Sequence, residues 1–232
     1  MTGTTGTGVA DPRAHVVPRV ILVALIVLIS ISWLVAPKAK PLVIVYGDSL
    51  TVQSEADARS LHHGSGERVI FRARGGTAMC DWTGRAGFDV LALHPSRVVL
   101  AFTGNTASCA AAAFRSGGAA GATALYEMSL RQMRAIFADV PITLVIPPAM
   151  HNLPHGWYPF NGNAELVAMY KRVGAQLGMS INTRADDTLT PGHVFTAIRP
   201  AYPNGPLVNV RLSDGIHLTP AGELWYGAAL LG

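Results

Sequence analysis

A serine stands directly after a short apolar stretch, in the sequence Gly47-Asp48-Ser49-Leu50. The residues before it, Leu-Val-Ile-Val-Tyr at 42–46, are typical of a buried strand. A serine at the turn from a strand into a helix exposes its hydroxyl at the end of the sheet, and the helix N-terminus favours the negative charge that develops on attack. Alternatively, Asp48 or Ser49 only caps the helix, as both residue types often do.

A second reactive pair lies near the C-terminus, in the sequence Asp214-Gly215-Ile216-His217. An aspartate three residues before a histidine in one turn can accept a hydrogen bond from the imidazole. That bond fixes the tautomer and directs the other ring nitrogen toward a serine hydroxyl. The other interpretation is a capping aspartate beside a surface histidine.

Two further turns carry groups that can stabilise an oxyanion. Residues 74–77 read Arg-Gly-Gly-Thr, and paired glycines let a backbone N–H approach a ligand closely. Residues 103–105 read Thr-Gly-Asn, and the Asn105 amide can donate a second hydrogen bond to the same oxygen. Ordinary tight turns have the same composition, so each motif alone is ambiguous.

Apolar runs alternate with helical patterns from residue 42 onward and predict the elements that position these groups. We expect strands at 42–46, 68–72, 97–102, 142–146 and 180–183, and helices at 50–62, 88–94, 122–138, 164–177 and 220–231. Strands that are apolar throughout must be covered on both faces, which predicts a parallel sheet between two layers of helices. Ligands of such sheets bind at the carboxyl ends of the strands, where the serine, glycine and asparagine turns fall.

Two segments carry more detailed expectations. In the helix at 122–138, one apolar face is expected to hold Leu125, Met128, Met133 and Ile136, with Leu130 and Phe137 at its edge. Residues 186–212 are rich in proline and glycine without a clear period, so we expect a long surface loop near the site.

Taken in order, the four motifs resemble the blocks of the SGNH (GDSL-type) hydrolases, a family named for Ser, Gly, Asn and His. The resemblance covers residues 42–232, and Gly-Asp-Ser-Leu and Asp-Gly-Ile-His are its most specific blocks. It implies a flavodoxin-like three-layer α/β/α fold. It also implies an esterase or acyltransferase mechanism that needs no metal and no organic cofactor.

The same resemblance assigns roles to individual residues. Ser49 is the nucleophile, His217 the catalytic base and Asp214 its partner. The oxyanion donors are the backbone N–H of Ser49, the N–H of Gly76 with Gly75 as the alternate, and the side chain of Asn105. Many members have aspartate after this asparagine; Thr106 replaces it here, so different support for Asn105 is expected.

Cys80 and Cys109 are the two cysteines of the chain. An even pair behind a secretory-type segment indicates one disulfide in an oxidising compartment, and two buried free thiols are the alternative. Within the family resemblance, both cysteines lie on loops that leave the second and third strands. Their disulfide would then brace the oxyanion donors Gly76 and Asn105.

An uncharged apolar segment at 20–36 is long enough for about 25 Å of helix. Arg19 and Lys38 flank it, and Trp33 lies near its outer end as an interfacial anchor would. We expect a cytosolic tail at 1–18, a single transmembrane signal anchor at 19–37 and an extracytoplasmic domain at 42–232. The alternative is a cleaved signal peptide and a secreted domain.

Charge and motif content exclude several other functions. The net charge is +4, but the first forty residues hold four of the 18 basic side chains and one of the 14 acidic ones. The nearly neutral domain, without Lys/Arg runs, predicts no nucleic-acid partner. No Walker loop or Gly-x-Gly-x-x-Gly follows the first strand. Pro154 prevents a helical pairing of His151 and His155, so no metal site is expected.

Two classes of function remain. The first is a serine esterase or O-acyltransferase acting on acyl esters of cell-envelope glycan at the outer membrane face. At most about 18 Å of extended chain, residues 37–41, separates the anchor from the first strand. Because Ser49 follows the far end of that strand, its site would face away from the bilayer lipid. The second class is a catalytically idle, membrane-tethered glycan-binding or scaffold protein with the same fold.

Overall fold

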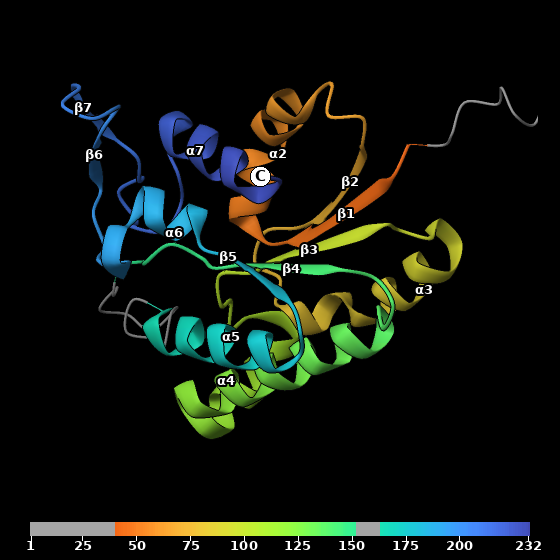
Figure 1. The fold of residues 1–232 in the computed structure, drawn as a ribbon. Coiled ribbons are helices and arrows are strands. Elements are labelled where there is room, and N and C mark those ends of the chain that lie inside the picture. Colours follow the sequence, from red (N-terminus) through yellow and green to blue (C-terminus); the bar gives the residue numbers. More distant parts are fainter. Residues whose placement is uncertain (1–39, 152–162) are drawn as a thin grey trace, which may run out of the picture. The chain divides into compact units, whose positions relative to one another are not determined.

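The computed structural model describes residues 40–151 and 163–232 (Figure 1). The expected cytosolic tail and membrane anchor, and also His155, lie outside the described residues. Within the two described ranges, no helix is long and apolar enough to cross a membrane.

Five parallel strands form the central sheet, in the order β2-β1-β3-β4-β5. They are β1 (Leu42–Gly47), β2 (Arg68–Ala73), β3 (Arg97–Ala101), β4 (Ile142–Val145) and β5 (Ser180–Asn182). Gly47 pairs with Ala73 on one side and with Ala101 on the other, so these strands end at one level. β2 lies on one side of β1 and β3 lies on the other, so the strand order reverses direction at β1. In parallel sheets, such a reversal opens a crevice at the carboxyl ends of the strands.

Helices cover both faces of the sheet (Figure 1). One face carries α2 (Ser49–His62), α6 (Arg184–Leu189) and α7 (Pro220–Leu230), and the other carries α3 (Thr83–Leu93), α4 (Ala111–Ile136) and α5 (Ala164–Gln176). Short 3₁₀ turns occur at Met79–Trp82, Ser108–Ala110 and Pro191–His193. The predicted three-layer fold with a parallel sheet is therefore confirmed.

Strand β1 lies at the centre of both cores. Ile44 and Tyr46 enter the core beneath α4, whereas Val43 and Val45 enter the core beneath α2 and α7. Each of these side chains is fully buried, and burial of such a side chain contributes about 1.5–3 kcal/mol. This two-sided burial explains why the strand before Ser49 is apolar throughout, and it fixes the turn that follows.

The helix expected at 122–138 begins instead at Ala111 and is kinked at Gly118, whose φ is 58°. The first part of this helix is rich in alanine but shows no helical repeat of apolar residues. Only the high helix propensity of alanine indicates a helix there, so the expected start was too late. Leu130 and Met133 are buried as expected, but Met128 is 49% exposed, so its placement on the buried face was wrong. The buried stripe instead runs through Tyr126.

The loop expected at 186–212 also needs correction. It contains most of α6 and an antiparallel hairpin of β6 (Ile198–Pro200) and β7 (Leu207–Asn209). Strands of this length are too short for their apolar period to be recognised in the sequence. Helix α3 likewise begins before the expected position 88.

Candidate active site

Ser49 is the first residue of α2, immediately beyond the carboxyl end of β1. The N-cap is Asp48, whose Oδ1 accepts a hydrogen bond from the backbone N–H of Leu50 at 3.2 Å. The capping role therefore belongs to Asp48. Ser49 is partly exposed at the helix N-terminus, where a developing negative charge is favoured.

Asp48 connects the serine turn to the asparagine turn. Its fully buried carboxylate accepts hydrogen bonds at Oδ2 from Thr103 N (2.7 Å), Thr103 Oγ1 (2.6 Å) and Asn105 Nδ2 (3.3 Å). Burial raises the pKa of Asp48 to about 6, although the Thr103 bonds and the charge of His217 act in the opposite direction.

The raised pKa of Asp48 predicts a pH-dependent stability. Between the ordinary aspartate pKa of about 4 and the folded pKa of about 6, the folded protein holds a proton that the unfolded chain has released. The contribution of Asp48 to the free energy of unfolding should therefore fall as the pH rises through this window. We expect urea unfolding to lose this component of its pH slope in Asp48→Asn and to keep it in Asp139→Asn, an exposed control. Identical slopes in Asp48→Asn and wild type would contradict the prediction.

The Asp214–His217 turn is closed by hydrogen bonds to a single carboxylate. Asp214 Oδ2 lies 2.6 Å from His217 Nδ1, and Oδ1 accepts from the backbone N–H groups of Ile216 (2.8 Å) and His217 (2.9 Å). Burial raises the pKa of Asp214, but the His217 side chain and the two N–H groups outweigh it and hold the pKa below its ordinary value. The ionised carboxylate keeps the proton on Nδ1 and leaves Nε2 as the accepting nitrogen.

Gly215 makes this turn possible. Its φ is +69°, a left-handed conformation that favours glycine. A Cβ at this position would also lie 2.4 Å from the Cβ of His151, whose backbone N–H donates to Gly215 O at 3.1 Å. The loop after β4 therefore packs against the turn that carries His217 and supports it. This contact gives His151 a structural role.

Helix α2 and the His217 turn are joined by Gln53, one turn beyond Ser49. The Gln53 amide donates to Leu218 O (3.3 Å) and accepts from Leu218 N (3.2 Å). Helices α2 and α7 also pack together along one face of the sheet (Figure 1). The structure thus brings the Ser49 and His217 segments to the same corner of the domain. Gln53 was missed because a helical glutamine carries no chemical signature.

The glycine turn lies beyond β2 and is held to β1 by a hydrogen bond from Arg74 N to Gly47 O (3.3 Å). Gly76 has a φ of +73°, so the turn needs glycine there. A Cβ built on Gly75 would lie 3.8 Å from the Cβ of Ser49, so the backbone of Gly75 faces the serine. Gly76 as oxyanion donor remains a prediction, and this geometry favours the alternate, Gly75.

Asn105 is buried, 6% exposed, between the glycine turn and Asp48. Its Nδ2 donates to Thr77 O at 3.1 Å and to Asp48 Oδ2 at 3.3 Å, and its own carbonyl accepts from the Tyr126 hydroxyl at 2.9 Å. Asp48 and Tyr126 thus both help to hold Asn105 in place. An oxyanion formed at Ser49 would compete with Asp48 Oδ2 for the Asn105 Nδ2 hydrogen, because the bond to Asp48 is the longer of the two that this amide donates.

Replacing Asn105 with alanine tests this arrangement. We expect Asn105→Ala to lower kcat on p-nitrophenyl acetate by about 10²- to 10³-fold, on the order of 3 kcal/mol, with little change in KM, because the donor acts on the charged intermediate. Tyr126→Phe should cost less, because it removes a support of the Asn105 backbone and leaves the amide donor in place. A raised KM at unchanged kcat would contradict the oxyanion role.

Cys80 and Cys109 form the expected disulfide, with their Cα atoms 6.1 Å apart. Asp81 reinforces the same junction, since its Oδ1 accepts from Ser108 Oγ (2.6 Å) and its Oδ2 from Ala78 N (2.9 Å). The glycine loop and the asparagine loop are therefore linked both covalently and by hydrogen bonds.

Carboxylate–histidine pairs also occur away from Asp214. Glu67 lies 2.9 Å from His62 at the end of α2, and a second such pair, which the sequence did not suggest, joins Asp186 and His193 at 2.9 Å. Asp186 also accepts from Thr190, whose hydroxyl in turn accepts from Ala149 N. His193 Nε2 is buried, whereas the His217 side chain is 36% exposed. The second pair therefore stabilises loops, and His217 is the histidine that a substrate can approach. Among the described residues, no cluster of three or more His, Cys, Asp or Glu is arranged to hold a metal.

Comparison with known proteins places the fold. No protein-family model matches the chain, and no curated protein matches its sequence. A lipase/acylhydrolase from Enterococcus faecalis matches with a TM-score of 0.59 at 20% identity, over 82% of this chain and 92% of that chain. A variant of an acetyl xylan esterase from Geobacillus stearothermophilus matches with a TM-score of 0.59 at 15% identity, over 83% and 94%.

A GDSL-like lipase from Bacteroides thetaiotaomicron VPI-5482 matches with a TM-score of 0.55 at 17% identity, over 82% of this chain and 88% of that chain. At such identities the likeness is one of fold. The chain therefore has the three-layer α/β fold that these lipases and esterases share.

Proposed function

We propose that this protein is an SGNH-type serine esterase in which Ser49 attacks the carbonyl carbon of an acyl ester. The observation that carries the proposal is the convergence at one corner of the sheet. Ser49 begins α2, and Gln53 of the same helix holds the turn in which Asp214 orients His217. The shared fold with lipases and acetyl xylan esterases supports the same chemistry.

The mechanism follows from these groups. His217 Nε2 takes the Ser49 proton as Oγ bonds to the carbonyl carbon, and the carbonyl electron pair moves onto oxygen. The oxyanion accepts hydrogen bonds from the Ser49 N–H, from a glycine N–H of the 75–76 turn and from Asn105. Collapse expels the alcohol, which receives the proton from His217. Water, or a sugar hydroxyl in a transferase, then attacks the acyl-enzyme and releases or transfers the acyl group.

We infer that the substrate is an acyl ester on a cell-envelope glycan. If residues 19–37 anchor the chain in a membrane, the chain enters the domain at Lys40, just before the first residue of β1. Ser49 follows the last residue of that strand, at its opposite end (Figure 1). The site would then face away from the bilayer. One protein of the same fold is an acetyl xylan esterase, which acts on an acylated polysaccharide.

Competing substrates test this proposal in the full-length chain. We expect release of acetate from acetylated xylan or acetylated peptidoglycan, and little release of fatty acid from phospholipid vesicles. Ser49→Ala serves as the blank for both. Preferential hydrolysis of the phospholipid would reject the glycan assignment while retaining the esterase. The mass of the protein from its native host tests the anchor, because a cleaved signal peptide would remove residues 1–36.

A further inference from the structure

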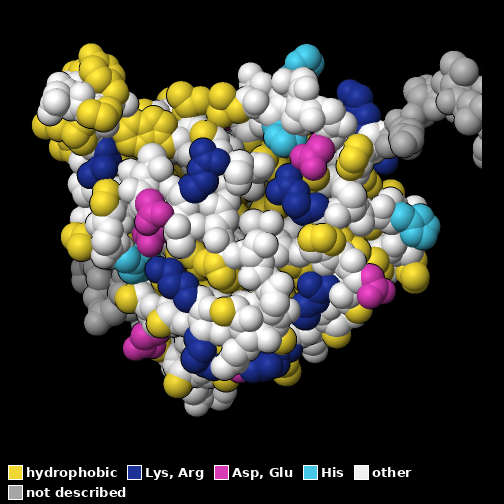
Figure 2. Space-filling view, in the orientation of Figure 1, with side chains coloured by type: hydrophobic (Ala, Val, Ile, Leu, Met, Phe, Trp, Pro, Cys, Tyr) yellow, Lys and Arg dark blue, Asp and Glu magenta, His cyan; other side chains and the backbone are white. Residues whose placement is uncertain are grey.

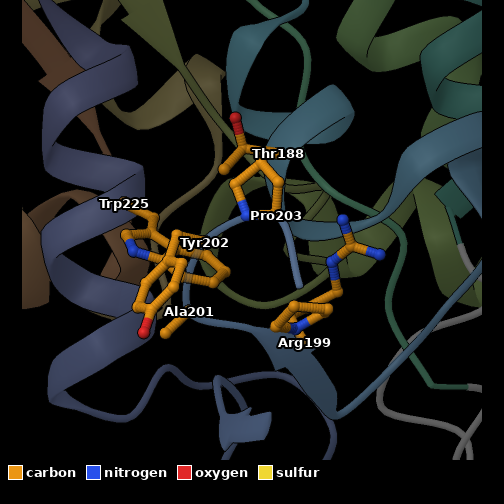
Figure 3. A pocket seen from close by; sticks show the side chains of 7 residues that line it. Thr188, Arg199, Ala201, Tyr202, Pro203 and Trp225 are labelled. Atoms are coloured by element: carbon orange, nitrogen blue, oxygen red, sulfur yellow. The ribbon is translucent and has the colours of Figure 1, made fainter. Parts of the chain in front are cut away.

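A pocket of about 370 Å³ lies between the β6–β7 hairpin, α6 and α7, in the region expected to be a plain surface loop (Figure 3). Its walls include Thr188, Arg199, Tyr202, Pro203 and Trp225. This volume falls in the range of small-molecule sites, which combine apolar and aromatic walls with a few polar groups. None of these residues takes part in the proposed ester chemistry.

No hydrogen bond or ion pair joins the Arg199 side chain to another described residue, whereas Arg72 pairs with Asp89 and Arg97 pairs with Glu67. Several exposed arginines, namely Arg68, Arg74, Arg115 and Arg184, also have no side-chain hydrogen bond or ion pair among the described residues, but Arg199 differs from them in being partly buried. Its Nε is shielded from solvent and lacks a hydrogen-bond partner. A guanidinium presents its N–H donors as a planar fork that matches a carboxylate. An unpaired arginine lining a pocket therefore indicates an anionic ligand.

Aromatic rings form the other side of the pocket. In Figure 3, Trp225 and Tyr202 lie on one side and Arg199 lies on the other. Tyr202 is 64% exposed, and its turn is closed by a hydrogen bond from Gly205 N to Tyr202 O at 2.8 Å. A Cβ at Gly205 would lie 2.9 Å from the Tyr202 ring, so the ring packs against the backbone of this turn. Exposed aromatic faces suit the apolar C–H face of a sugar ring.

The hairpin and the His217 turn belong to one hydrogen-bonded unit. Val210, directly after β7, donates to Ala197 O at 2.8 Å, and Leu212 donates to His217 O at 2.8 Å. Trp225 lies five positions after Pro220 on α7, about 8 Å along the helix. The hairpin that lines the pocket is thus connected by hydrogen bonds to the segment that carries His217.

The hairpin also carries exposed apolar side chains, which suggest a lipid surface as an alternative ligand. Ile198 is 53% and Leu207 70% exposed, and Figure 2 shows hydrophobic side chains gathered over the hairpin. An apolar surface would leave the guanidinium of Arg199 without a partner, whereas an anionic ligand would pair with it, so the pocket favours a charged ligand.

We propose that this pocket binds a carboxylate-bearing sugar unit, a hexuronate, of a glycan chain. The carboxylate pairs with Arg199, and the apolar face of the ring packs against Trp225 and Tyr202. The suggestion that the bound glycan is also the one whose ester Ser49 cleaves rests on the proposed function. The binding of a hexuronate in the pocket does not depend on that function.

Two ligands that differ only at C6 provide the test, methyl β-D-glucuronide and methyl β-D-glucoside. Titration of the full-length chain, followed by tryptophan fluorescence and ligand NMR, should give a Kd at least about tenfold lower for the glucuronide, because a charge-assisted bond is lost with the glucoside. Arg199→Gln should remove this preference, and Arg199→Lys, which keeps the charge without the fork, should weaken it. Arg115→Gln, an exposed arginine on α4, should leave it unchanged.

Octanoate tests whether the pocket recognises a sugar ring or an acyl chain, because it carries a carboxylate on an aliphatic tail. Binding of octanoate as tight as that of the glucuronide would overturn the saccharide assignment. Equal binding of the two glycosides, or no binding of either, would overturn the proposal as a whole. None of these measurements needs turnover. An inactive protein that binds glucuronide would reject the esterase and keep the pocket, whereas an active one that does not bind would reject the pocket alone.

Discussion

Replacing Ser49 with alanine is expected to abolish hydrolysis of p-nitrophenyl acetate, lowering kcat by on the order of 10⁵-fold or more. The reason is chemical, because the other hydroxyl at the start of α2, that of Thr51, is fully buried and donates to Ala101 O at 3.3 Å. The oxyanion donors would remain, so a small residual rate above that of water is expected. Because Ser49 is not the helix cap and is only partly buried, the melting temperature should change little.

Ser54 provides a matched control on the same helix. Its side chain is buried, and its hydroxyl has no hydrogen-bond partner among the described residues. Ser54→Ala should therefore keep full activity and leave the stability equal or slightly higher, because an unsatisfied buried hydroxyl is removed. A fluorophosphonate probe should label wild type and Ser54→Ala but not Ser49→Ala. Hydrolysis retained in Ser49→Ala would reject the serine mechanism.

Local chemistry made much of the fold predictable. β1 could be recognised because a strand buried on both faces is apolar throughout, and the turn after it because Gly-Asp-Ser interrupts that run. The disulfide followed from having only two cysteines, Cys80 and Cys109, behind a secretory-type segment. The β6–β7 hairpin could not be recognised, since its strands are too short to show a period.

The supporting contacts of the site are non-local, and this is why sequence reasoning missed them. Asp48 reads as a helix cap, yet its other carboxylate oxygen bonds to Thr103 and Asn105, more than fifty residues away. Gln53 reads as a solvent-facing helical residue, yet it holds Leu218 at the other end of the chain. The contacts of Asp48 depend on the pairing of β1 with β3, and those of Gln53 depend on the packing of α2 against α7. No local sequence pattern records either arrangement. Residue type suggested the candidate reacting groups, and tertiary packing supplied the contacts that hold these residues.

Asp214→Asn is expected to lower kcat on the order of 10⁴-fold while leaving KM nearly unchanged. The carboxylate accepts three hydrogen bonds, from the His217 ring and from the N–H groups of Ile216 and His217. An asparagine has one accepting oxygen, which the two backbone N–H groups would retain. Its NH₂ group would then face Nδ1 of His217 and force the ring proton onto Nε2. The imidazole could no longer accept the proton of Ser49.

The tautomer of His217 distinguishes this explanation from a loss of charge alone. In ¹⁵N NMR, neutral His217 should carry its proton on Nδ1 in wild type and on Nε2 in Asp214→Asn, whereas Asp139→Asn should resemble wild type. Because hydrogen bonding holds the pKa of Asp214 below its ordinary value, the carboxylate stays ionised at neutral pH. Lost activity with an unchanged tautomer would show that Asp214 acts through its charge, and full activity in the variant would reject it as the partner of His217.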